Sequence, residues 1–346
     1  NVDKHSTGGV GDKTTLILAP IVAACGGKVA KMSGRGLGNT GGTIDKLESI
    51  PGFRTALTEE EFIKNVNETG LALTGQTGNL APADKKIYAL RDVTASVDSI
   101  PLIASSIMSK KIASGADAIV LDVKVGNGAF MKNMQDAEKL AKQMVMIGTN
   151  SGRNTIAVIS DMNEPLGYAV GNALEVKEAV DTLKGRGPED VVELCLGAQM
   201  LIASEITDDR QAAVDMLKKS IENGSAYAKF AEFVKRQGGD VSVLDDCDSI
   251  INARYIVDIV SENSGYVSSI QSELIGETAM ILGGGRQNKG DDIDHSVGVV
   301  LSKKVGDKVD KGDVIATIYA NDKDRIEAAN ELIVKAFAIQ KEIVDT

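Results

Sequence analysis

Tryptophan is absent from this chain, and aromatic residues together make up only 3% of its 346 residues. Aliphatic side chains must therefore fill the core. Proteins that bind single-stranded nucleic acid without sequence preference stack the bases on aromatic side chains. The shortage of aromatic residues argues against that class of protein.

Cysteine is scarce as well, with only Cys25, Cys195 and Cys247 in the chain. An odd number of widely separated cysteines fits neither a disulfide framework nor a zinc site, and disulfides are rare in reducing compartments. We therefore expect reduced thiols and a cytoplasmic location. The sequence shows no apolar run of about 18 residues and no signal peptide, so it predicts no membrane span.

Positive charge is in deficit, because the formal net charge is −11. A protein that binds nucleic acid or an anionic membrane usually carries a basic surface, and no long cluster of Lys and Arg occurs here. A small anionic ligand is still compatible with the sequence, because one pocket can be positive on an acidic protein. The length allows two domains, or one large α/β domain with an appendage.

Strand-like and helix-like segments alternate from residue 26 to about residue 161. Residues 116–126 form an apolar, β-branched run typical of a buried parallel strand. A helix is predicted over residues 135–148, and a second buried strand follows it. Thr58 and Glu61 have the spacing of a capping box at the start of another helix. This alternation predicts a mostly parallel sheet flanked by helices.

The predicted fold class is α/β with two additions to that sheet. The phosphate-binding α/β domain is expected to comprise residues 1–82 and 114–255. Residues 83–113 interrupt it as a small helical module, the remnant of a base-binding domain. Residues 256–346 are expected to form a C-terminal α+β domain rich in β-hairpins, with a final helix near residues 325–343.

The stretch DKHSTGGVGDKTT, residues 3–15, has the composition of a loop that binds an anion. Glycine lets backbone N–H groups approach a ligand closely, and a helix that begins after the loop directs free amides and its positive dipole end toward it. Lys4 adds a positive charge, while Ser6 and Thr15 add hydroxyl donors. The stretch is neither a P-loop, because no glycine stands directly before a Lys-Thr or Lys-Ser pair, nor a dinucleotide fingerprint, because no sufficiently long strand precedes GGVG.

A second stretch, KMSGRGLGNTGGTIDKLES, offers Ser33, Thr43 and further glycine amides after a strand. Glycine clusters more often mark tight turns than ligand sites. Two such loops after neighbouring strands are more informative, because ligands in open α/β sheets bind at the carboxyl edge. Together the loops predict a site for a small anion such as phosphate.

These motifs resemble those of the pyrimidine-nucleoside and thymidine phosphorylases. The resemblance lies in DKHSTGGVGDKTT, SGRGLGNTGGTIDKLESIPGF, ADKKIYALRDVTASVDSIPLIASSIMSKKIA and VGNGAFM, and it extends from residue 1 to about residue 320. It implies a pentosyltransferase that catalyses reversible phosphorolysis. Uridine, thymidine or deoxyuridine plus inorganic phosphate would give pentose 1-phosphate and free base, without an organic cofactor.

The resemblance also implies the roles of individual residues. The phosphate contacts would be Lys4, Ser6, Thr15, Lys31, Met32, Ser33 and Thr43. The pyrimidine contacts would be Tyr88, Arg91, Ser106 and Lys110. The catalytic residues would be His5, Arg91 and Lys110, which would stabilise the negative charge of the departing base.

A monovalent cation, taken as potassium, is a further implication of the resemblance. Its ligands would be the backbone carbonyls of Gly11, Lys13, Leu166 and Ala169 and the carboxylate of Glu178. Position 13 is a lysine where the family pattern leads us to expect a small hydroxyl residue. A carbonyl ligand does not depend on the side chain, but an ammonium beside the ion competes with it unless it points away.

The resemblance finally implies a homodimer and a helical segment ahead of residue 1. That segment completes the small α domain in the family and makes much of the dimer contact. The printed chain begins just before the DKHSTGG motif and lacks this segment.

Three alternatives stay open at the level of sequence. A phosphorylase restricted to thymidine fits the same motifs. An anthranilate-type phosphoribosyltransferase resembles the predicted fold, but it requires acidic magnesium ligands and a different base pocket. The C-terminal VGDKVDKGDVIATI resembles a lipoyl or biotin carrier module, yet its lysines lack the flanking residues of a modified lysine, which favours a structural appendage.

Overall fold

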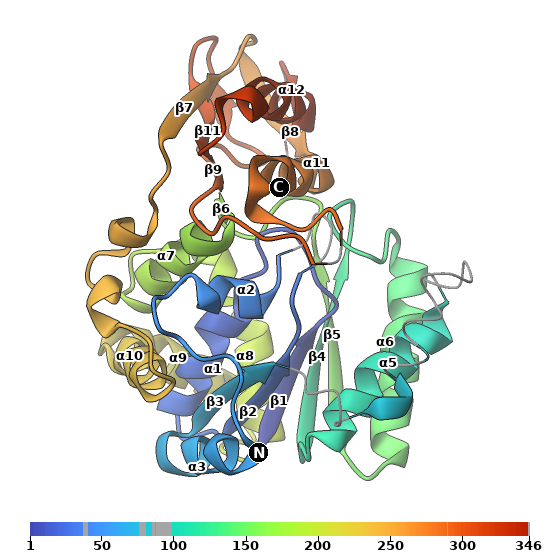
Figure 1. The fold of residues 1–346 in the computed structure, drawn as a ribbon. Helices are drawn as coiled ribbons and strands as arrows, with labels where there is room; N and C mark the ends of the chain where they lie inside the picture. The colour runs from blue at the N-terminus through green and yellow to red at the C-terminus, as the bar shows by residue number, and fades with distance from the viewer. Residues whose placement is uncertain (37–40, 76–80, 85–86, 88–98, 289, 345–346) are drawn as a thin grey trace.

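The central element of the fold is a five-stranded parallel sheet (Figure 1). The computed structural model describes residues 1–36, 41–75, 81–84, 87, 99–288 and 290–344. The strand order is β3-β2-β1-β4-β5 and every pairing is parallel. The strands are β1 (Val2–Ser6), β2 (Val29–Ser33), β3 (Leu71–Gly75), β4 (Ala118–Val125) and β5 (Asn154–Asp161). The parallel sheet predicted from the sequence is confirmed.

Helices cover both faces of this sheet, as the pattern predicted. On one side lie α1 (Thr14–Ala24), α7 (Asn172–Leu183), α8 (Leu194–Ala203), α9 (Arg210–Glu222) and α10 (Ser225–Arg236), with the short α2 (Thr43–Glu48) against α7. On the other side lie α3 (Glu59–Thr69), α5 (Ile100–Ala113) and α6 (Met134–Asn150). The predicted capping box is confirmed, because the Thr58 side chain accepts from the Glu61 N–H and the Glu61 carboxylate accepts from the Thr58 N–H.

The side chains of β4 show why the sheet must be covered twice. Successive residues of a strand point to opposite faces, so Ala118 and Val120 pack with α1 and α8, whereas Ile119, Leu121 and Val123 pack with α5 and α6. A strand that is apolar on both faces cannot leave either face in water. Helix α5 accordingly packs on the central sheet within the described part of the chain.

The C-terminal part forms two antiparallel sheets, of three and four strands. The strand orders are β10-β8-β12 and β6-β9-β11-β7. Their elements are β6 (Ala169–Val170), β7 (Tyr255–Val260), β8 (Gly265–Ile270), α11 (Ser272–Ala279), β9 (Gly298–Leu301), β10 (Lys308–Val309), β11 (Val314–Ala320), α12 (Ile326–Ala336) and β12 (Phe337–Gln340). Short helical turns lie at Asp190–Val192, Val241–Leu244, Cys247–Ile250, Met280–Gly284 and Lys323–Arg325.

Three sequence-based expectations are wrong in detail. Residues 2–6 are a strand rather than part of a loop, because β1 pairs with β2 and β4 through its backbone while its charged side chains find buried partners. The final helix ends at Ala336, because residues 337–340 pair with β8 instead. The C-terminal domain was expected to be rich in β-hairpins, but VGDKVDKGDVIATI does not form one, because β10 and β11 belong to different sheets.

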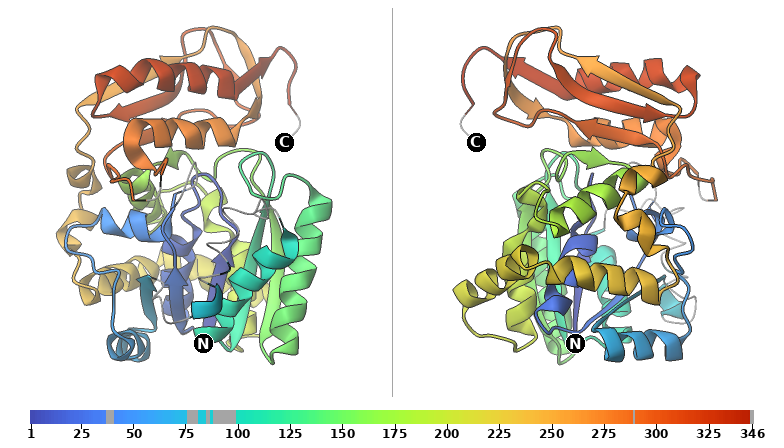
Figure 2. Two further views of the ribbon diagram at one scale, coloured as in Figure 1. Left: turned by 45° about the vertical axis from the view of Figure 1, so that its right-hand side comes forward. Right: turned by 90° about the vertical axis from the view of Figure 1, so that its left-hand side faces the viewer.

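The C-terminal sheets lie above the carboxyl ends of the central strands (Figure 2). Strand β6, which precedes α7, pairs with β9 and so joins the two parts of the chain. Among the helices described, none is both long and apolar enough to cross a bilayer.

Gln237 protects the edge of the central sheet at β3. Its Oε1 accepts from the Leu73 N–H at 2.9 Å, and its Nε2 donates to the carbonyls of Leu73 and Arg54, each at 2.8 Å. The side chain is fully buried. An edge strand otherwise presents unpaired N–H and C=O groups, so Gln237 completes the pairing of β3.

Replacing Gln237 with leucine should lower the free energy of unfolding by about 3 kcal/mol, because it leaves buried backbone groups of β3 without hydrogen-bond partners. Urea denaturation followed by circular dichroism measures this change. The matched control is Gln211→Leu on α9. Its side chain donates to the exposed Asp215, and the change should alter stability by less than about 0.5 kcal/mol. Equal effects in the two variants would contradict the role assigned to Gln237.

Candidate active site

The two glycine-rich loops meet at the carboxyl edge of the sheet, where β1 and β2 end. A pocket of about 460 Å³ opens there, within the usual size range of small-molecule sites. Among the residues named from the sequence, its lining includes His5, Ser6, Thr15, Lys31, Met32, Ser33, Thr43, Ser106 and Lys110. The structure therefore brings six of the proposed phosphate contacts into one pocket with Ser106 and Lys110.

Of the proposed phosphate and pyrimidine contacts that the structure describes, only Lys4 is absent from this lining. Tyr88 and Arg91 lie outside the described residues. Lys4 is on β1 behind the pocket wall and is only 2% exposed. Its Nζ lies 3.5 Å from Asp122 Oδ2 and has no hydrogen-bond acceptor within the described part of the chain.

Helix α5 supplies one wall of the pocket. Ser106 and Lys110 are one turn apart and therefore lie on the same helix face, together with Ile103 and Ile107. The Lys110 ammonium donates to Ser106 Oγ at 3.0 Å and lies 2.9 Å from Asp84 Oδ2. This places a positive charge and a hydroxyl next to two apolar side chains, an arrangement suited to a flat polar ring.

Lys111, the next residue on α5, is part of the site although sequence analysis did not single it out. Its Nζ is 2.7 Å from Asp3 Oδ2 and donates to the Met32 carbonyl at 3.1 Å. Lys31 lies 3.6 Å from the other oxygen of Asp3 and donates to the backbone carbonyl of Lys4. Two buried ammonium groups thus share one carboxylate.

Burial and this sharing together set the ionisation of Lys31. Burial and, next, repulsion from Lys111 lower the pKa of Lys31 to about 7, although Asp3 opposes the change. An anion that enters the pocket would stabilise the charged form of Lys31. In the absence of an anionic ligand, the pocket has fewer carboxylates than ammonium groups around Asp3.

His5 is held in its neutral form. Burial, followed by repulsion from Lys111, Lys31 and Lys4, lowers the pKa of His5 well below its ordinary value. A neutral imidazole has one nitrogen that donates a hydrogen bond and one that accepts. His5 can thus donate a hydrogen bond to a ligand without adding a charge.

Asp12 is a pocket residue that sequence analysis missed. It accepts from the Ser6 hydroxyl and, at 3.2 Å, from the Thr14 N–H. Burial opposes its ionisation, but Lys4 and Lys124 overcome this and hold the pKa of Asp12 well below its usual range. The Ser6 hydroxyl proton is therefore directed at a carboxylate rather than into the pocket.

Beneath the pocket, β4 carries a buried ion-pair network. The ammonium of Lys124 lies 3.1 Å from Asp122 Oδ2 and 2.5 Å from Glu193 Oε1. The other Glu193 oxygen accepts from Thr14 Oγ1 at 2.6 Å, while burial and repulsion from Asp122 raise the pKa of Glu193. The alternating Asp and Lys in the otherwise apolar ADAIVLDVKVG was the signal that could have revealed this network.

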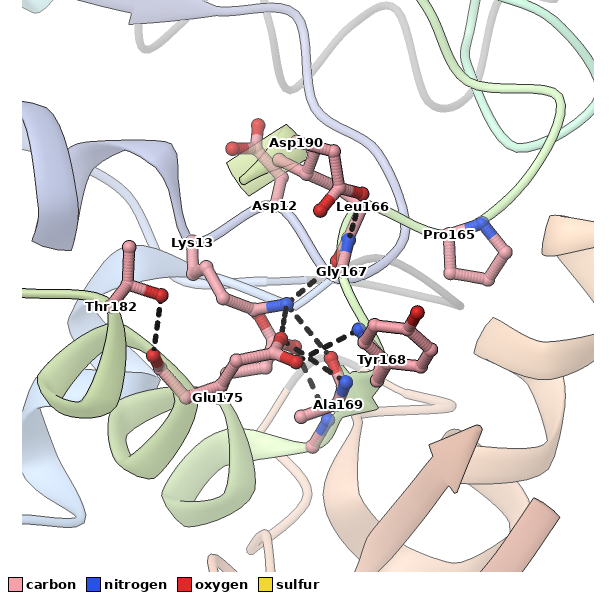
Figure 3. A network of polar contacts seen from close by, with 12 residues as sticks. Asp12, Lys13, Pro165, Leu166, Gly167, Tyr168, Ala169, Glu175, Thr182 and Asp190 are labelled. Carbon is pink, nitrogen blue, oxygen red and sulfur yellow. Dashed lines mark hydrogen bonds and ion pairs between the residues drawn. The ribbon is translucent and has the colours of Figure 1, made fainter. Parts of the chain in front are cut away.

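The residues predicted to bind potassium also come together, but around the side chain of Lys13 (Figure 3). The Lys13 Nζ donates to the carbonyls of Leu166 and Ala169 at 2.7 and 3.0 Å and to Glu178 Oε2 at 2.5 Å. The carbonyl of Gly11 instead accepts from the Lys13 backbone N–H at 2.8 Å.

This arrangement does not fit the expected potassium ion. Three of the oxygens assigned to the ion are already hydrogen-bonded to the ammonium. An ion beside it would place two positive charges about 4 Å apart, which repel by about 4 kcal/mol at an effective dielectric constant near 20. Elsewhere among the described residues, no group of three or more His, Cys, Asp and Glu is placed to hold a metal.

Two family descriptions match the chain. Residues 1–227 match "Glycosyl transferase family, a/b domain", and residues 266–340 match "Pyrimidine nucleoside phosphorylase C-terminal domain". The two matches correspond to the parallel sheet with its helices and to the antiparallel C-terminal sheets.

Curated relatives are similar over nearly the whole chain. A pyrimidine-nucleoside phosphorylase of Staphylococcus haemolyticus is 62% identical over 322 residues, which are 92% of this chain and 74% of that protein. One of Bacillus subtilis is 60% identical over 338 residues, 97% of this chain and 77% of that protein. Among solved structures, an anthranilate phosphoribosyltransferase of Thermus thermophilus matches with a TM-score of 0.53 at 17% identity, covering 68% of this chain and 77% of that one. At that identity the likeness is one of fold alone.

The affinity of the pocket for an oxyanion should fall as the pH rises above about 7. A bound anion favours charged Lys31, whose pKa is about 7 in the free protein, so at higher pH binding must be accompanied by uptake of a proton. Sulfate is a suitable probe because it does not titrate in this range. Its dissociation constant, measured by calorimetry, should rise by up to about tenfold per pH unit above pH 7.

Lys31→Met should remove this pH dependence and weaken sulfate binding. Lys142→Met, which changes a lysine that is 76% exposed on α6, should keep the original profile. A wild-type affinity that is the same at about pH 6 and about pH 9 would contradict the linkage to Lys31.

Proposed function

This chain belongs to the pyrimidine-nucleoside phosphorylase family, and from that premise we propose that it catalyses the reversible phosphorolysis of uridine, thymidine and deoxyuridine. Inorganic phosphate displaces the base, which leaves pentose 1-phosphate and a free pyrimidine. The observation that carries the proposal is that two sets of residues line the same pocket. Lys31, Ser33 and Thr43 come from the glycine-rich side, and Ser106 and Lys110 come from α5.

In this proposal, phosphate binds at the ends of β1 and β2. Thr15, Ser33 and Thr43 supply hydroxyl donors, and Lys31 supplies the positive charge that the bound anion restores. A phosphate oxygen forms a bond to C1′ of the sugar while the C1′–N1 bond breaks. Holding phosphate in line with this carbon converts an encounter of two molecules into a step within one complex.

The base binds against α5. As the glycosidic bond breaks, its electron pair passes to the pyrimidine ring, so the ring oxygens gain negative charge. In the proposal, Lys110, the Ser106 hydroxyl and the neutral His5 stabilise that charge by hydrogen bonds. Tyr88 and Arg91 join them in the proposal through the family resemblance alone. Phosphate is the nucleophile, so the protein needs none of its own.

The alternative reading as an anthranilate-type phosphoribosyltransferase has less support. The solved structure that suggests it shares the fold at 17% identity, whereas the curated relatives at about 60% identity carry the phosphorylase name. Restriction to thymidine remains a variant of the proposed function, to be decided by comparing kcat/KM for uridine and thymidine.

Potassium is not part of the proposed function, because the Lys13 ammonium is bonded to the oxygens that would bind it. The homodimer remains a prediction from the family resemblance. A cytoplasmic location remains a prediction as well, to which the free state of Cys25, Cys195 and Cys247 is suited.

Lys110→Ala should lower kcat/KM for uridine and phosphate by about 10²-fold, the usual effect of losing one preorganised donor at a developing negative charge. Release of uracil, followed by absorbance, measures this. Lys142→Ala on α6 is the matched control and should leave kcat/KM unchanged. The proposal fails if Lys110→Ala keeps wild-type kinetics, or if the wild-type protein releases no base from any of the three nucleosides.

A further inference from the structure

The Lys13 side chain joins the first glycine loop to a region more than 150 residues away in the sequence. It starts from the glycine loop ahead of α1 and ends among the carbonyls of Leu166 and Ala169 and the carboxylate of Glu178 on α7. Figure 3 shows the Lys13 nitrogen directed toward Leu166 and Ala169. The lysine side chain is fully buried, and the Glu178 side chain is 11% exposed.

The hydrogen bonds of this cluster are complete. A lysine ammonium has three donors and no acceptor, and each of its three protons has one acceptor here. The Glu178 carboxylate also accepts from the backbone N–H groups of Tyr168 at 2.9 Å and Ala169 at 3.2 Å. The positive charge of Lys13 and the negative charge of Glu178 balance each other.

A ring of carbonyl and carboxylate oxygens around one positive charge is also how proteins bind a dehydrated monovalent cation, since the oxygens replace its hydration shell. We propose that the Lys13 ammonium is a built-in replacement for such a cation. The protein then holds its glycine loop in place without potassium.

Lys13 acts on the pocket through the backbone beside it. Asp12 and Thr15, its near neighbours in the chain, line the pocket. The loop is also packed tightly against the ring, because a Cβ added to Gly11 would lie 2.7 Å from the Leu166 carbonyl oxygen. Lys13 is therefore a positioning residue rather than a catalytic one.

Removal of the lysine side chain should leave its acceptor oxygens without the ammonium donor. Three oxygens, one of them charged, would then point into a buried space with no positive charge. A potassium or ammonium ion could fill that space if residue 13 is small, but not if an apolar side chain occupies it. Lys13→Thr should therefore acquire a requirement for a monovalent cation that the wild-type protein does not have.

The test compares melting temperature and phosphorolysis in about 0.1 M KCl, NH4Cl or choline chloride, at the same ionic strength. The activity part rests on the proposed function, whereas the melting temperature does not. The wild-type protein should respond equally to the three salts. In choline chloride, Lys13→Thr should melt about 5 °C or more below the wild type, because breaking a buried ion pair leaves an unpaired charge. KCl and NH4Cl should recover much of the lost melting temperature. We also expect Lys13→Thr to have a higher KM for phosphate in choline chloride than the wild type, and KCl and NH4Cl should lower it.

Two further variants separate cation binding from general damage. Lys13→Met should be destabilised in all three salts with no recovery in KCl. Lys304→Met removes donors to the Pro165 and Gly167 carbonyls on the same segment but leaves the ring intact, so it should show no preference for potassium over choline.

The proposal is overturned if the wild-type protein is stabilised by potassium as strongly as Lys13→Thr, or if Lys13→Thr responds equally to KCl and choline chloride. It is also overturned if Lys13→Thr fails to fold in every salt, whereas folding only in KCl or NH4Cl supports it. A wild-type protein that cleaves no nucleoside while the melting temperatures follow the expected pattern would refute the proposed function and leave this inference standing.

Discussion

The burial of lysine ammonium groups around one edge of the sheet is the constraint on which the site depends. A buried charge is tolerated only when it is paired and hydrogen-bonded. Lys46 meets this condition, with Glu175 Oε2 at 2.9 Å. Lys31 and Lys111 are hydrogen-bonded as well, but the two ammonium groups share the single carboxylate of Asp3. Both of these lysines line the pocket, and two buried ammonium groups with one carboxylate between them leave an excess of positive charge that attracts an anion.

The geometry of the pocket follows from the topology around that edge. Parallel strands place the loops after β1 and β2 side by side, and the packing of α5 on the sheet brings Ser106 and Lys110 across from them. The C-terminal part also contributes, because Arg286 donates to Asp45 Oδ1 at 2.9 Å and to the Gly36 carbonyl at 3.4 Å, next to the second glycine loop. The antiparallel sheets thus help to hold a loop of the site and are more than an appendage.

Much of the fold and of the pocket lining could be predicted, because local patterns determine them. The apolar period of β4, the Thr58–Glu61 cap and the glycine-hydroxyl loops are each readable within a few residues. The features that could not be predicted depend on residues far away in the sequence. VDKHS has too few apolar residues to be recognised as a strand, and its Asp3 is neutralised by Lys111, which lies 108 residues away. Where a long side chain such as Lys13 ends is likewise decided by the segments around it.

The central claim is that the pocket at the ends of β1 and β2 captures an oxyanion and presents it to the base-binding wall on α5. A crystal structure of the protein with saturating phosphate tests this most directly. One phosphate is expected within hydrogen-bond distance of the Thr15 and Ser33 hydroxyls and of Lys31 Nζ. Phosphate bound only elsewhere, with this pocket filled by water, would contradict it.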